Sequence, residues 1–428
     1  MQPLEIQRYA FNFAREPLRR PFHFKGGFFT EKWILVTSVE SAQGTRVTGI
    51  GGTAVLWSDP AVFFAHSEAG GNLLMAAMAE RAVALLQGQS FATPFDALEA
   101  VYDEVHRFGI RITGHENLSR TFTLNALVSL DLALWKLYAS ENRIENFDDL
   151  LPEAYRRVFS HHHDTLVHVP LIPYNMPVEE IVHLAETGHF VLKIKIGQAG
   201  DTEEMLAKDT ARLREIHQAL HGKKTPHTEH GKLLYYLDAN GRYRDKQSLF
   251  DLLDQADKIG MLEQILLLEE PFPAHLTLDV ADIPVRVVAD ETLHSLADVR
   301  ERIDLGYTAM AVKPAGKTLS MTLKMAAYAA QHEIPCFVAD SACVPLLLDW
   351  NLNIAARLPR FPGLATGLIE SNGAQQYKHW GQFLERHPCS GKRWLEPSGG
   401  FFSLDAEFYR CDGGIFFPPG QYADLVMF

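Results

Sequence analysis

Charged side chains stand at the ends of short apolar segments in the second half of the chain. Three successive segments end in carboxylates, and segments that end in lysine precede and follow them. Charges at solvated strand ends would be scattered in sign and type, so this order favours one shared site. The residues concerned are Lys193, Lys195, Asp238, Asn240, Glu269, Glu270, Asp290, Glu291, Lys313, Asp340, Ser341 and Glu370.

The carboxylates Asp238, Glu269 and Asp290 form a donor set of hard oxygen atoms. Such a set suits Mg²⁺, with Mn²⁺ as the alternative, and does not suit zinc with His or Cys ligands. A metal bound to the oxygens of a substrate carboxylate stabilises the charge that develops when the neighbouring carbon loses a proton. The set therefore predicts abstraction of a proton alpha to a carboxylate.

Lys193 and Lys195 supply the base that this reaction needs. Alternate residues of a strand share one face, so these two side chains point the same way, as do Asp238 and Asn240. A nearby metal and a second ammonium group both disfavour the charged form of a lysine. We therefore expect the lysine pKa to fall toward the working range of a base.

The pairs Glu269-Glu270 and Asp290-Glu291 follow the opposite rule, since neighbouring residues of a strand point to opposite faces. Only one member of each pair can face a common centre. We expect Glu269 and Asp290 to point inward, and Glu270 and Glu291 to support them.

A parallel barrel would bring these strand ends together. From about residue 165, short apolar strands alternate with helical segments, the pattern of βα units around a parallel sheet. Eight such units favour a closed barrel, in which the carboxyl ends of the strands meet at one face. The predicted strands lie near residues 167–172, 190–196, 233–239, 265–270, 285–290, 308–313, 335–340 and 366–370.

The chain is too long for one ordinary core, and three parts are predicted. Residues 1–140 mix strands and helices, residues 160–380 form an α/β barrel of the (β/α)7-8 TIM type, and residues 381–428 return to the first part. Residues 43–45 predict a hairpin turn, and the apolar residues 123–139 predict a buried helix. Residues 161–163 and 223–232 predict polar loops.

The strand ends KIK, DAN, EEP, ADE and VKP, in this order and spacing, resemble the enolase superfamily. The nearest branch is the muconate-lactonizing one, in the mandelate racemase/muconate lactonizing enzyme family. Residues 127–137 resemble the buried helix that closes the family's N-terminal α+β capping domain. The segment DGGIFFPPGQYADL resembles the one that returns to that cap, so the resemblance covers nearly the whole chain.

This resemblance implies a reaction through a Mg²⁺-stabilised enediolate. It implies Lys195 and Lys313 as acid/base groups on opposite faces of the substrate, with Lys193 as the modulator of Lys195. It also implies Asp238, Glu269 and Asp290 as the metal ligands, with Asn240 as a polar neighbour.

At two places the strand-end residues differ from the pattern of a branch of the family. The mandelate-racemase branch pairs a His on the seventh strand with an Asp on the sixth, whereas here these strands end in Asp340-Ser341 and Lys313. Dipeptide epimerases carry Asp-x-Asp on the eighth strand, whereas here it ends in Glu370-Ser371-Asn372. Racemisation, epimerisation, cycloisomerisation and dehydration share the first proton abstraction, so all four stay open.

In the family the cap closes the barrel mouth and supplies specificity. The candidate segments here are residues 21–27 and 49–60. Phe22, His23, Phe24 and Lys25 are the candidate substrate contacts. Ordinary packing within the cap is the alternative for the two phenylalanines.

Composition excludes several classes of protein. The formal net charge of −13 argues against a general nucleic-acid binder. No apolar run approaches the roughly 20 residues of a membrane span, and residues 1–20 do not resemble a signal peptide. The four cysteines form no CxxC pair, which fits a reducing cytoplasm. We expect a cytoplasmic homo-oligomer that acts on a small carboxylate, without nucleic-acid or membrane partners.

Two alternatives remain. A Schiff-base aldolase on the same barrel would use Lys195 or Lys313 as a covalent nucleophile, but it would not need three carboxylates. A non-catalytic relative that binds a carboxylate ligand would not need the complete set of lysines and carboxylates.

Overall fold

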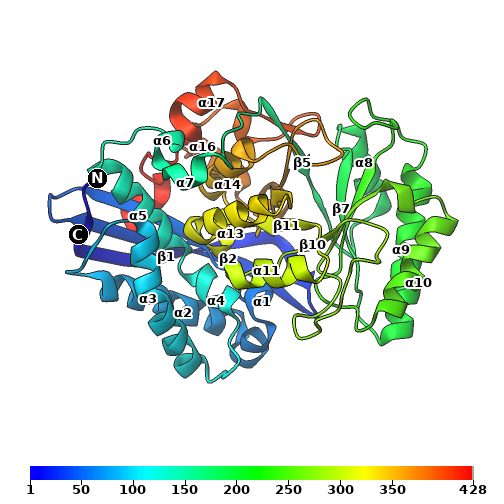
Figure 1. Ribbon diagram of the computed structural model, residues 1–428, viewed down its shortest axis with the longest axis horizontal. Coiled ribbons are helices and arrows are strands. Elements are labelled where there is room, and N and C mark those ends of the chain that lie inside the picture. Colours follow the sequence, from blue (N-terminus) through cyan, green and yellow to red (C-terminus); the bar gives the residue numbers. More distant parts are fainter. Residues whose placement is uncertain (427–428) are drawn as a thin grey trace.

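The computed structural model describes residues 1–426 of the chain. Its strands form a four-stranded sheet and a ten-stranded sheet. Figure 1 shows the N-terminal sheet and its helices at the left and the barrel at the right, with both marked termini beside the N-terminal sheet. The described ends of the chain therefore both lie on the side away from the barrel.

Antiparallel pairing organises the N-terminal sheet, whose order is β3-β2-β1-β4. The long strands β1 (Leu4–Phe24) and β2 (Gly27–Ser41) pair with each other, and β2 also pairs with β3 (Arg46–Gly52). The short β4 (Ser90–Phe91) lies beside β1. The turn predicted at residues 43–45 joins β2 to β3 and is confirmed.

Helices pack against this sheet and, together with it, form what is called the cap below. The buried helix predicted at residues 123–139 is present but is divided at Leu127. Gly49 lets this helix approach β3 closely, because an added Cβ would lie 2.3 Å from the backbone oxygen of Ser129. The cap helices are α1 (Val55–Ser58), α2 (Pro60–Leu86), α3 (Pro94–Thr113), α4 (Arg120–Ala126) and α5 (Val128–Glu141).

One helix of the described residues, α2, is long and apolar enough to cross a membrane by length and composition alone. Half of the window that meets this criterion is buried inside the structure. Core helices of soluble proteins meet the same criterion, so α2 is weak evidence for a membrane span.

The eight predicted barrel strands are all present, and the first is divided at Pro170. Each ends within a few residues of its predicted boundary, because the apolar runs that define them are buried in the barrel wall. They are β5 (Thr165–Val169) with β6 (Leu171–Ile172), β7 (Val191–Lys195), β8 (Leu234–Asp238), β9 (Ile265–Glu269), β10 (Val287–Ala289), β11 (Ala309–Val312), β12 (Cys336–Val338) and β13 (Gly367–Glu370).

Parallel pairing runs in chain order from β6 through β7 to β13, and β13 pairs with β5. Since only Pro170 separates β5 from β6, the first strand pairs at both ends of the series and the ring closes. A last strand, β14 (Phe401–Ser403), adds to β5 in antiparallel direction. The predicted barrel with an N-terminal capping domain is thus confirmed.

Helices alternate with the barrel strands. Three of them are capped at the N-terminus by Asp201, Asp245 and Ser295, whose side chains accept hydrogen bonds from the first helical turn. The helices of the barrel are α8 (Val178–Glu186), α9 (Thr202–Leu220), α10 (Lys246–Lys258), α11 (Leu296–Asp304), α12 (Pro314–Lys317), α13 (Leu319–Gln331) and α14 (Pro345–Arg357).

The chain after the barrel returns to the cap. Asn12 Nδ2 of β1 donates to the Leu425 oxygen at 2.9 Å, and Lys136 Nζ of α5 donates to the Phe417 oxygen at 2.8 Å. The exact part boundaries predicted near residues 140, 160 and 380 stay a prediction. The connecting and C-terminal helices are α6 (Phe147–Leu150), α7 (Glu153–Arg156), α15 (Gly373–Gln376), α16 (Trp380–Glu385) and α17 (Ala406–Cys411), with short 3-10 turns at 262–264, 393–395, 412–414 and 420–425.

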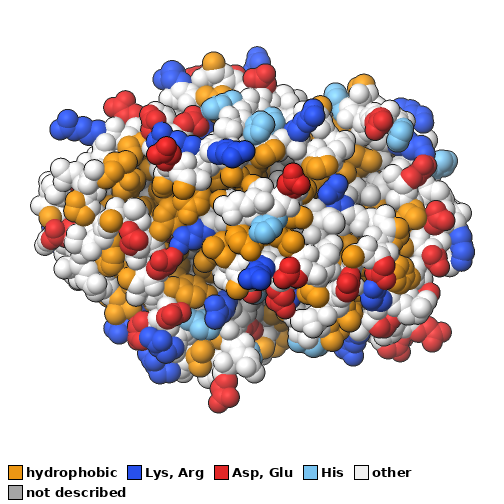
Figure 2. Space-filling model, in the orientation of Figure 1, with side chains coloured by type: hydrophobic (Ala, Val, Ile, Leu, Met, Phe, Trp, Pro, Cys, Tyr) orange, Lys and Arg blue, Asp and Glu red, His pale blue; other side chains and the backbone are white. Residues whose placement is uncertain are grey.

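Acidic and basic side chains are interspersed over the molecular face that Figure 2 shows, and no continuous basic stripe crosses that face. This mixture agrees with the net negative charge of the chain. It gives no sign on this face of a surface for a polyanion.

Candidate active site

A cavity of about 700 Å³ lies between the cap and the mouth of the barrel. The barrel contributes the ends of its strands, and the cap contributes a largely aromatic roof that also contains the charged residues Glu31, Lys32 and Glu68. Of the residues predicted from sequence, those that line this cavity are Phe22, Phe24, Lys193, Lys195, Asp238, Asn240, Asp290, Lys313, Asp340, Ser341 and Glu370.

Lys193 is the centre of a buried ion-pair network. Its Nζ lies 2.9 Å from Asp238 Oδ2 and 2.7 Å from Glu269 Oε2. Glu370 Oε2 is 3.0 Å away. Burial lowers the pKa of this ammonium, but the three carboxylates outweigh burial and hold the pKa well above its ordinary value. Tyr236 donates its hydroxyl hydrogen to Glu269 and thereby fixes that carboxylate.

Lys195 shares the face of β7 with Lys193, as predicted. Its Nζ donates to Asp238 Oδ2 at 2.6 Å and to Asn240 Oδ1 at 2.7 Å. Burial raises the pKa of Asp238, but the two ammonium groups lower it to about 2. Asp238 therefore stays ionised and holds both lysines of the motif in one place.

Lys313 faces the cavity from the opposite side, because β11 and β7 lie four places apart in the ring of eight. Its Nζ is 2.7 Å from Asp290 Oδ2. Lys317, one helical turn later, donates to the backbone oxygen of Asp290. Burial disfavours the charged forms of both Lys313 and Asp290. The ion pair with Asp290 nevertheless raises the pKa of Lys313, and Lys313 and Lys317 together lower the pKa of Asp290.

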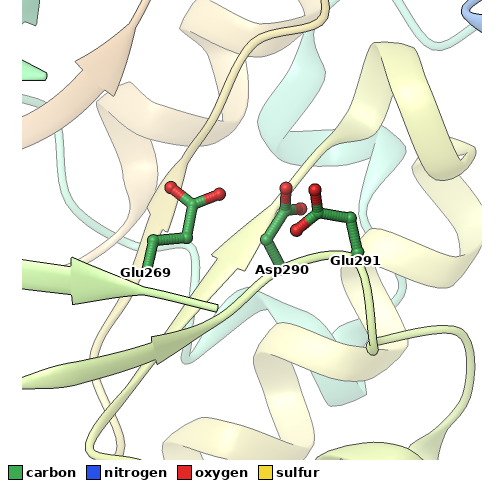
Figure 3. Close-up of side chains that lie close together, drawn as sticks. All are labelled: Glu269, Asp290 and Glu291. Carbon is green, nitrogen blue, oxygen red and sulfur yellow. The ribbon is translucent and has the colours of Figure 1, made fainter. Parts of the chain in front are cut away.

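Glu269, Asp290 and Glu291 form a compact carboxylate group, in which one oxygen of each lies within 4.8 Å of the others (Figure 3). Glu269 Oε1 and Glu291 Oε2 are buried and have no hydrogen-bond partner in the part of the chain that the structure describes. A buried carboxylate oxygen without a partner is unfavourable. A hard divalent cation would satisfy both atoms, so these residues fit Mg²⁺ or Mn²⁺. Asp238 adjoins this group through Lys193.

Glu270 and Glu291 were both expected to support the site from outside. Glu270 does so, since its Oε2 accepts hydrogen bonds from Asp290 N at 2.7 Å and from Thr292 Oγ1 at 3.2 Å. Burial and the neighbouring Glu291 raise the pKa of Glu270 to about 7. Glu291 instead lies among the inward carboxylates, because β10 ends at Ala289 and strand alternation no longer governs the residues after it.

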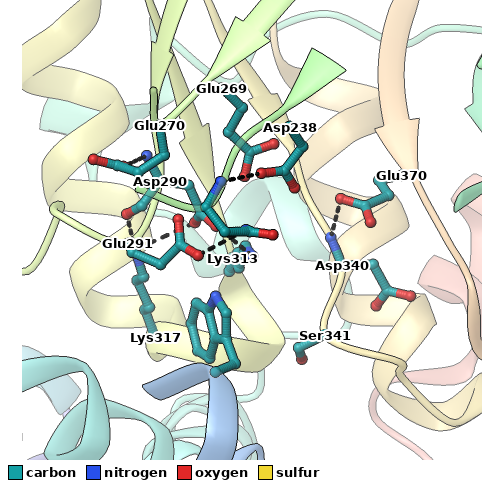
Figure 4. Close-up of polar contacts among 12 residues, drawn as sticks. Asp238, Glu269, Glu270, Asp290, Glu291, Lys313, Lys317, Asp340, Ser341 and Glu370 are labelled. Carbon is teal, nitrogen blue, oxygen red and sulfur yellow. Dashed lines mark hydrogen bonds and ion pairs between the residues drawn. The ribbon is translucent and has the colours of Figure 1, made fainter. Parts of the chain in front are cut away.

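The loops after β12 and β13 close the other side of the site. Figure 4 shows Asp340, Ser341 and Glu370 on one side of Lys313, with Glu270 and Glu291 on the other. Asp340 accepts hydrogen bonds from Cys343 N at 3.1 Å and Asn372 N at 2.7 Å. These bonds tie the two loops together, which gives Asp340 a positioning role.

The fall expected for the pKa of the Lys193 and Lys195 pair beside a bound metal stays a prediction, and in this structure three carboxylates hold the pKa of Lys193 above its ordinary value. Lys193 Nζ lies 2.7 Å from Glu269 Oε2 and Lys313 Nζ lies 2.7 Å from Asp290 Oδ2, and an ion pair favours the charged form. A divalent cation would compete with the ammonium groups for the same oxygens. The direction of the lysine pKa shifts therefore depends on whether the carboxylates bind a metal cation or only the ammonium groups.

Aromatic side chains of the cap cover the two outer lysines. The ring centre of Phe24 lies 4.8 Å from Lys195 Nζ, and that of Trp57 lies 4.4 Å from Lys313 Nζ. Lys25 joins cap and barrel, because its Nζ is 3.1 Å from Glu291 Oε1 and donates to the Trp57 oxygen at 3.2 Å. The predicted cap segments thus reach the strand ends.

The two other cap candidates differ. Phe22 lines the cavity and packs on Phe29 at a ring-centre distance of 5.3 Å. His23 is exposed, contacts Phe28 at 5.4 Å and does not line this cavity. The reason is the alternation of β1, which turns neighbouring side chains to opposite faces.

Sequence reasoning missed four residues of the site: Lys32, Trp57, Tyr236 and Lys317. Lys317 carried a usable signal, since it follows Lys313 by one helical turn and so shares its face. Trp57 lies within the cap segment 49–60 but was not singled out. Nothing in the local sequence distinguishes Lys32 or Tyr236 from ordinary strand residues.

Sequence comparison identifies the barrel. Residues 178–380 match the family model described as enolase C-terminal domain-like. A search of curated proteins found no match to this chain.

Solved structures share the fold over nearly the whole chain. A mandelate racemase/muconate lactonizing protein from Herpetosiphon aurantiacus is 18% identical, with a TM-score of 0.66 over 95% of this chain and 97% of that one. An N-succinyl Arg/Lys racemase from Bacillus cereus is 15% identical, with a TM-score of 0.62 over 88% and 89% of the chains. A dipeptide epimerase from Enterococcus faecalis, complexed with Mg and the dipeptide L-Leu-L-Tyr, is 16% identical, with a TM-score of 0.63 over 94% and 98%.

The strand-end motifs, the closed ring and the cap agree with these comparisons. Residues 178–380 are similar to the enolase C-terminal domain-like family, and the chain shares its fold with solved mandelate racemase/muconate lactonizing proteins.

Proposed function

We propose that the protein is a metal-dependent enzyme that removes the proton alpha to a substrate carboxylate and then returns a proton, as a racemase or epimerase. The observation that carries this proposal is the placement of Lys195 and Lys313 on opposite sides of one cavity, beside a compact carboxylate group. Cycloisomerisation and dehydration begin with the same step and are the alternative outcomes.

The lysines are the acid/base groups of this proposal. Lys195 lies at the end of β7 and Lys313 after β11, so a substrate between them presents one face to each. One lysine takes the proton from its face and the other delivers a proton to the opposite face, which inverts the carbon centre. Lys193 lies on the Lys195 side and holds Asp238, Glu269 and Glu370 in position.

The carboxylates are the proposed metal ligands. Glu269 and Asp290 would bind Mg²⁺ or Mn²⁺, and the neighbouring carboxylates Asp238 and Glu291 are the further candidate ligands. When bound, the cation would neutralise the charge that develops on the substrate carboxylate. The Phe24 and Trp57 rings over the lysines exclude water from the same space.

The test is exchange of the α-proton with deuterium from solvent. Amino-acid derivatives, sugar acids and succinyl compounds are incubated with the protein and Mg²⁺ in D₂O, and exchange is followed by NMR. We expect exchange with some members of this panel, and its loss in Lys195→Ala, in Glu269→Gln and after treatment with EDTA. Normal exchange in both variants would contradict the mechanism.

The same panel separates the alternatives. A Schiff-base aldolase would keep its activity in EDTA and would be trapped covalently by borohydride with its substrate. A non-catalytic relative would bind a carboxylate but exchange no proton. The homo-oligomeric state, the cytoplasmic location and the absence of nucleic-acid and membrane partners stay predictions from the sequence.

A further inference from the structure

A fourth lysine of the cavity comes from the cap. Lys32, on β2, lines the same cavity as Lys195 and Lys313, yet only 2% of its surface is exposed. Its Nζ donates one hydrogen bond, to the backbone oxygen of Ser341 on the barrel. An ammonium group has three donors, so two of them have no acceptor among the described residues.

No carboxylate of the described residues forms an ion pair with Lys32, in contrast to Lys193, Lys195 and Lys313. A buried charge without a counterion is costly, and burial lowers the pKa of Lys32 to about 8. A ligand that brought a negative charge to this ammonium would remove that cost.

Nearby carboxylates are already engaged elsewhere. Glu31 pairs with Arg15 at 2.8 Å, and Glu68 accepts hydrogen bonds from the backbone N–H groups of Thr30 and Glu31. Asp340 accepts two backbone N–H groups through its two oxygens. Lys32 therefore presents to the cavity a positive charge that forms no ion pair with the described residues.

The charge of Lys32 lies apart from the carboxylate group of the site. The carboxylate group and the base Lys195 lie at the ends of β7 through β10, whereas Lys32 bonds to the loop after β12, the strand next to β11 and the base Lys313. Aromatic and aliphatic side chains of the cap, Phe22, Phe29 and Leu56 among them, line the same cavity. The cavity thus combines an apolar wall with a second cationic site.

We propose that Lys32 binds a second anionic group of the substrate, so that the substrate is a dicarboxylate with an apolar middle. This inference rests on the proposed function, which assigns the first carboxylate to the metal and the lysine pair. The second carboxylate would accept the free donors of Lys32, which reaches the cavity from the cap.

The test is a binding experiment that does not depend on turnover. A homologous series of dicarboxylates, from succinate to suberate, is titrated into the protein with Mg²⁺ by calorimetry, each beside its own monoamide. The monoamide keeps one carboxylate and the length of the chain but removes the distal charge. We expect at least one dicarboxylate to bind about tenfold or more tightly than its monoamide.

Three variants assign this preference. Lys32→Met should bring the two affinities within about twofold of each other, and Lys32→Arg should retain the preference because it keeps the charge. Lys136→Met is the matched control, since Lys136 is a buried cap lysine that also donates to a backbone oxygen but lies outside this cavity. It should leave the preference unchanged.

Several results would overturn the assignment. They are equal affinities for acid and amide throughout the series, absence of binding by every member, and a preference that survives Lys32→Met. Failure of the proposed function is seen separately, as absence of α-proton exchange across the panel of carboxylates. A preference without exchange would therefore support Lys32 as an anion site and count against the catalytic proposal alone.

Discussion

At the scale of single residues, the lysines of the site partly neutralise the carboxylates that would bind the metal. Lys193 alone touches three carboxylates, and Lys313 and Lys317 share Asp290. The carboxylates that would hold a metal are thus already partly neutralised by lysines. A cation must compete with these ammonium groups, so the residue whose loss matters most is one with an oxygen that no lysine or hydrogen-bond donor engages.

Glu269 is such a residue, because its Oε1 is buried and has no hydrogen-bond partner among residues 1–426. We expect Glu269→Gln to weaken Mg²⁺ binding by about a hundredfold or more, since the amide removes a charge from the ligand set. Calorimetric titration of Mg²⁺ measures this. Glu203→Gln, an exposed residue of α9, is the control and should bind as the wild type does. Unchanged affinity in Glu269→Gln would show that the cation lies elsewhere.

At the scale of single elements, the buried helix α5 carries a charged side chain that lies outside the active site. Lys136 lies on α5, within the contact between the cap and the C-terminal segment. Burial lowers its pKa from 10.5 to about 8. Between these two pH values the unfolded chain binds more protons than the folded one, so this lysine makes the protein more stable as the pH rises.

Lys136→Met removes that dependence. At pH 7 we expect the variant to be more stable by about 1–2 kcal/mol, because a buried ammonium is replaced by an apolar side chain of similar volume. The advantage should shrink as the pH rises from about 8 to about 10.5. Urea unfolding at several pH values measures it, with the exposed Lys258→Met as control. An advantage that does not change with pH would show that the charge of Lys136 is not the cause.

At the scale of the whole molecule, one buried arginine joins distant parts of the chain through two ion pairs. Arg357, at the end of α14, lies 2.8 Å from Asp412 in the C-terminal segment and 2.6 Å from Asp148 in α6. Asp412 also accepts a hydrogen bond from Phe147 N at 2.8 Å. Barrel, connecting segment and C-terminal segment therefore meet at a single guanidinium group.

Asp412→Asn should destabilise the full chain by about 3 kcal/mol, because it leaves a fully buried arginine with only one carboxylate. The free energy of unfolding in urea measures this effect. Asp424→Asn, at an exposed site of the same segment, should change stability by less than about 0.5 kcal/mol. Equal stability of the two variants would contradict the structural role of the ion pair.

The order of the strand-end motifs was enough to predict the barrel and most of the site. Strands and helices follow from local periodicity, and the rule that parallel strands present their carboxyl ends at one face gathers Lys195, Asp238, Glu269, Asp290 and Lys313 without any knowledge of tertiary contacts. These features are encoded within a few neighbouring residues, so the sequence by itself determined them.

Tertiary structure alone decided the rest. Glu291 turns inward because strand β10 ends before it, and the pKa values of Lys193 and Lys313 rise because carboxylates of other strands lie against them. Lys32 meets Ser341 across 309 residues of sequence. Such contacts depend on how the cap sits on the barrel, and no local pattern records that arrangement.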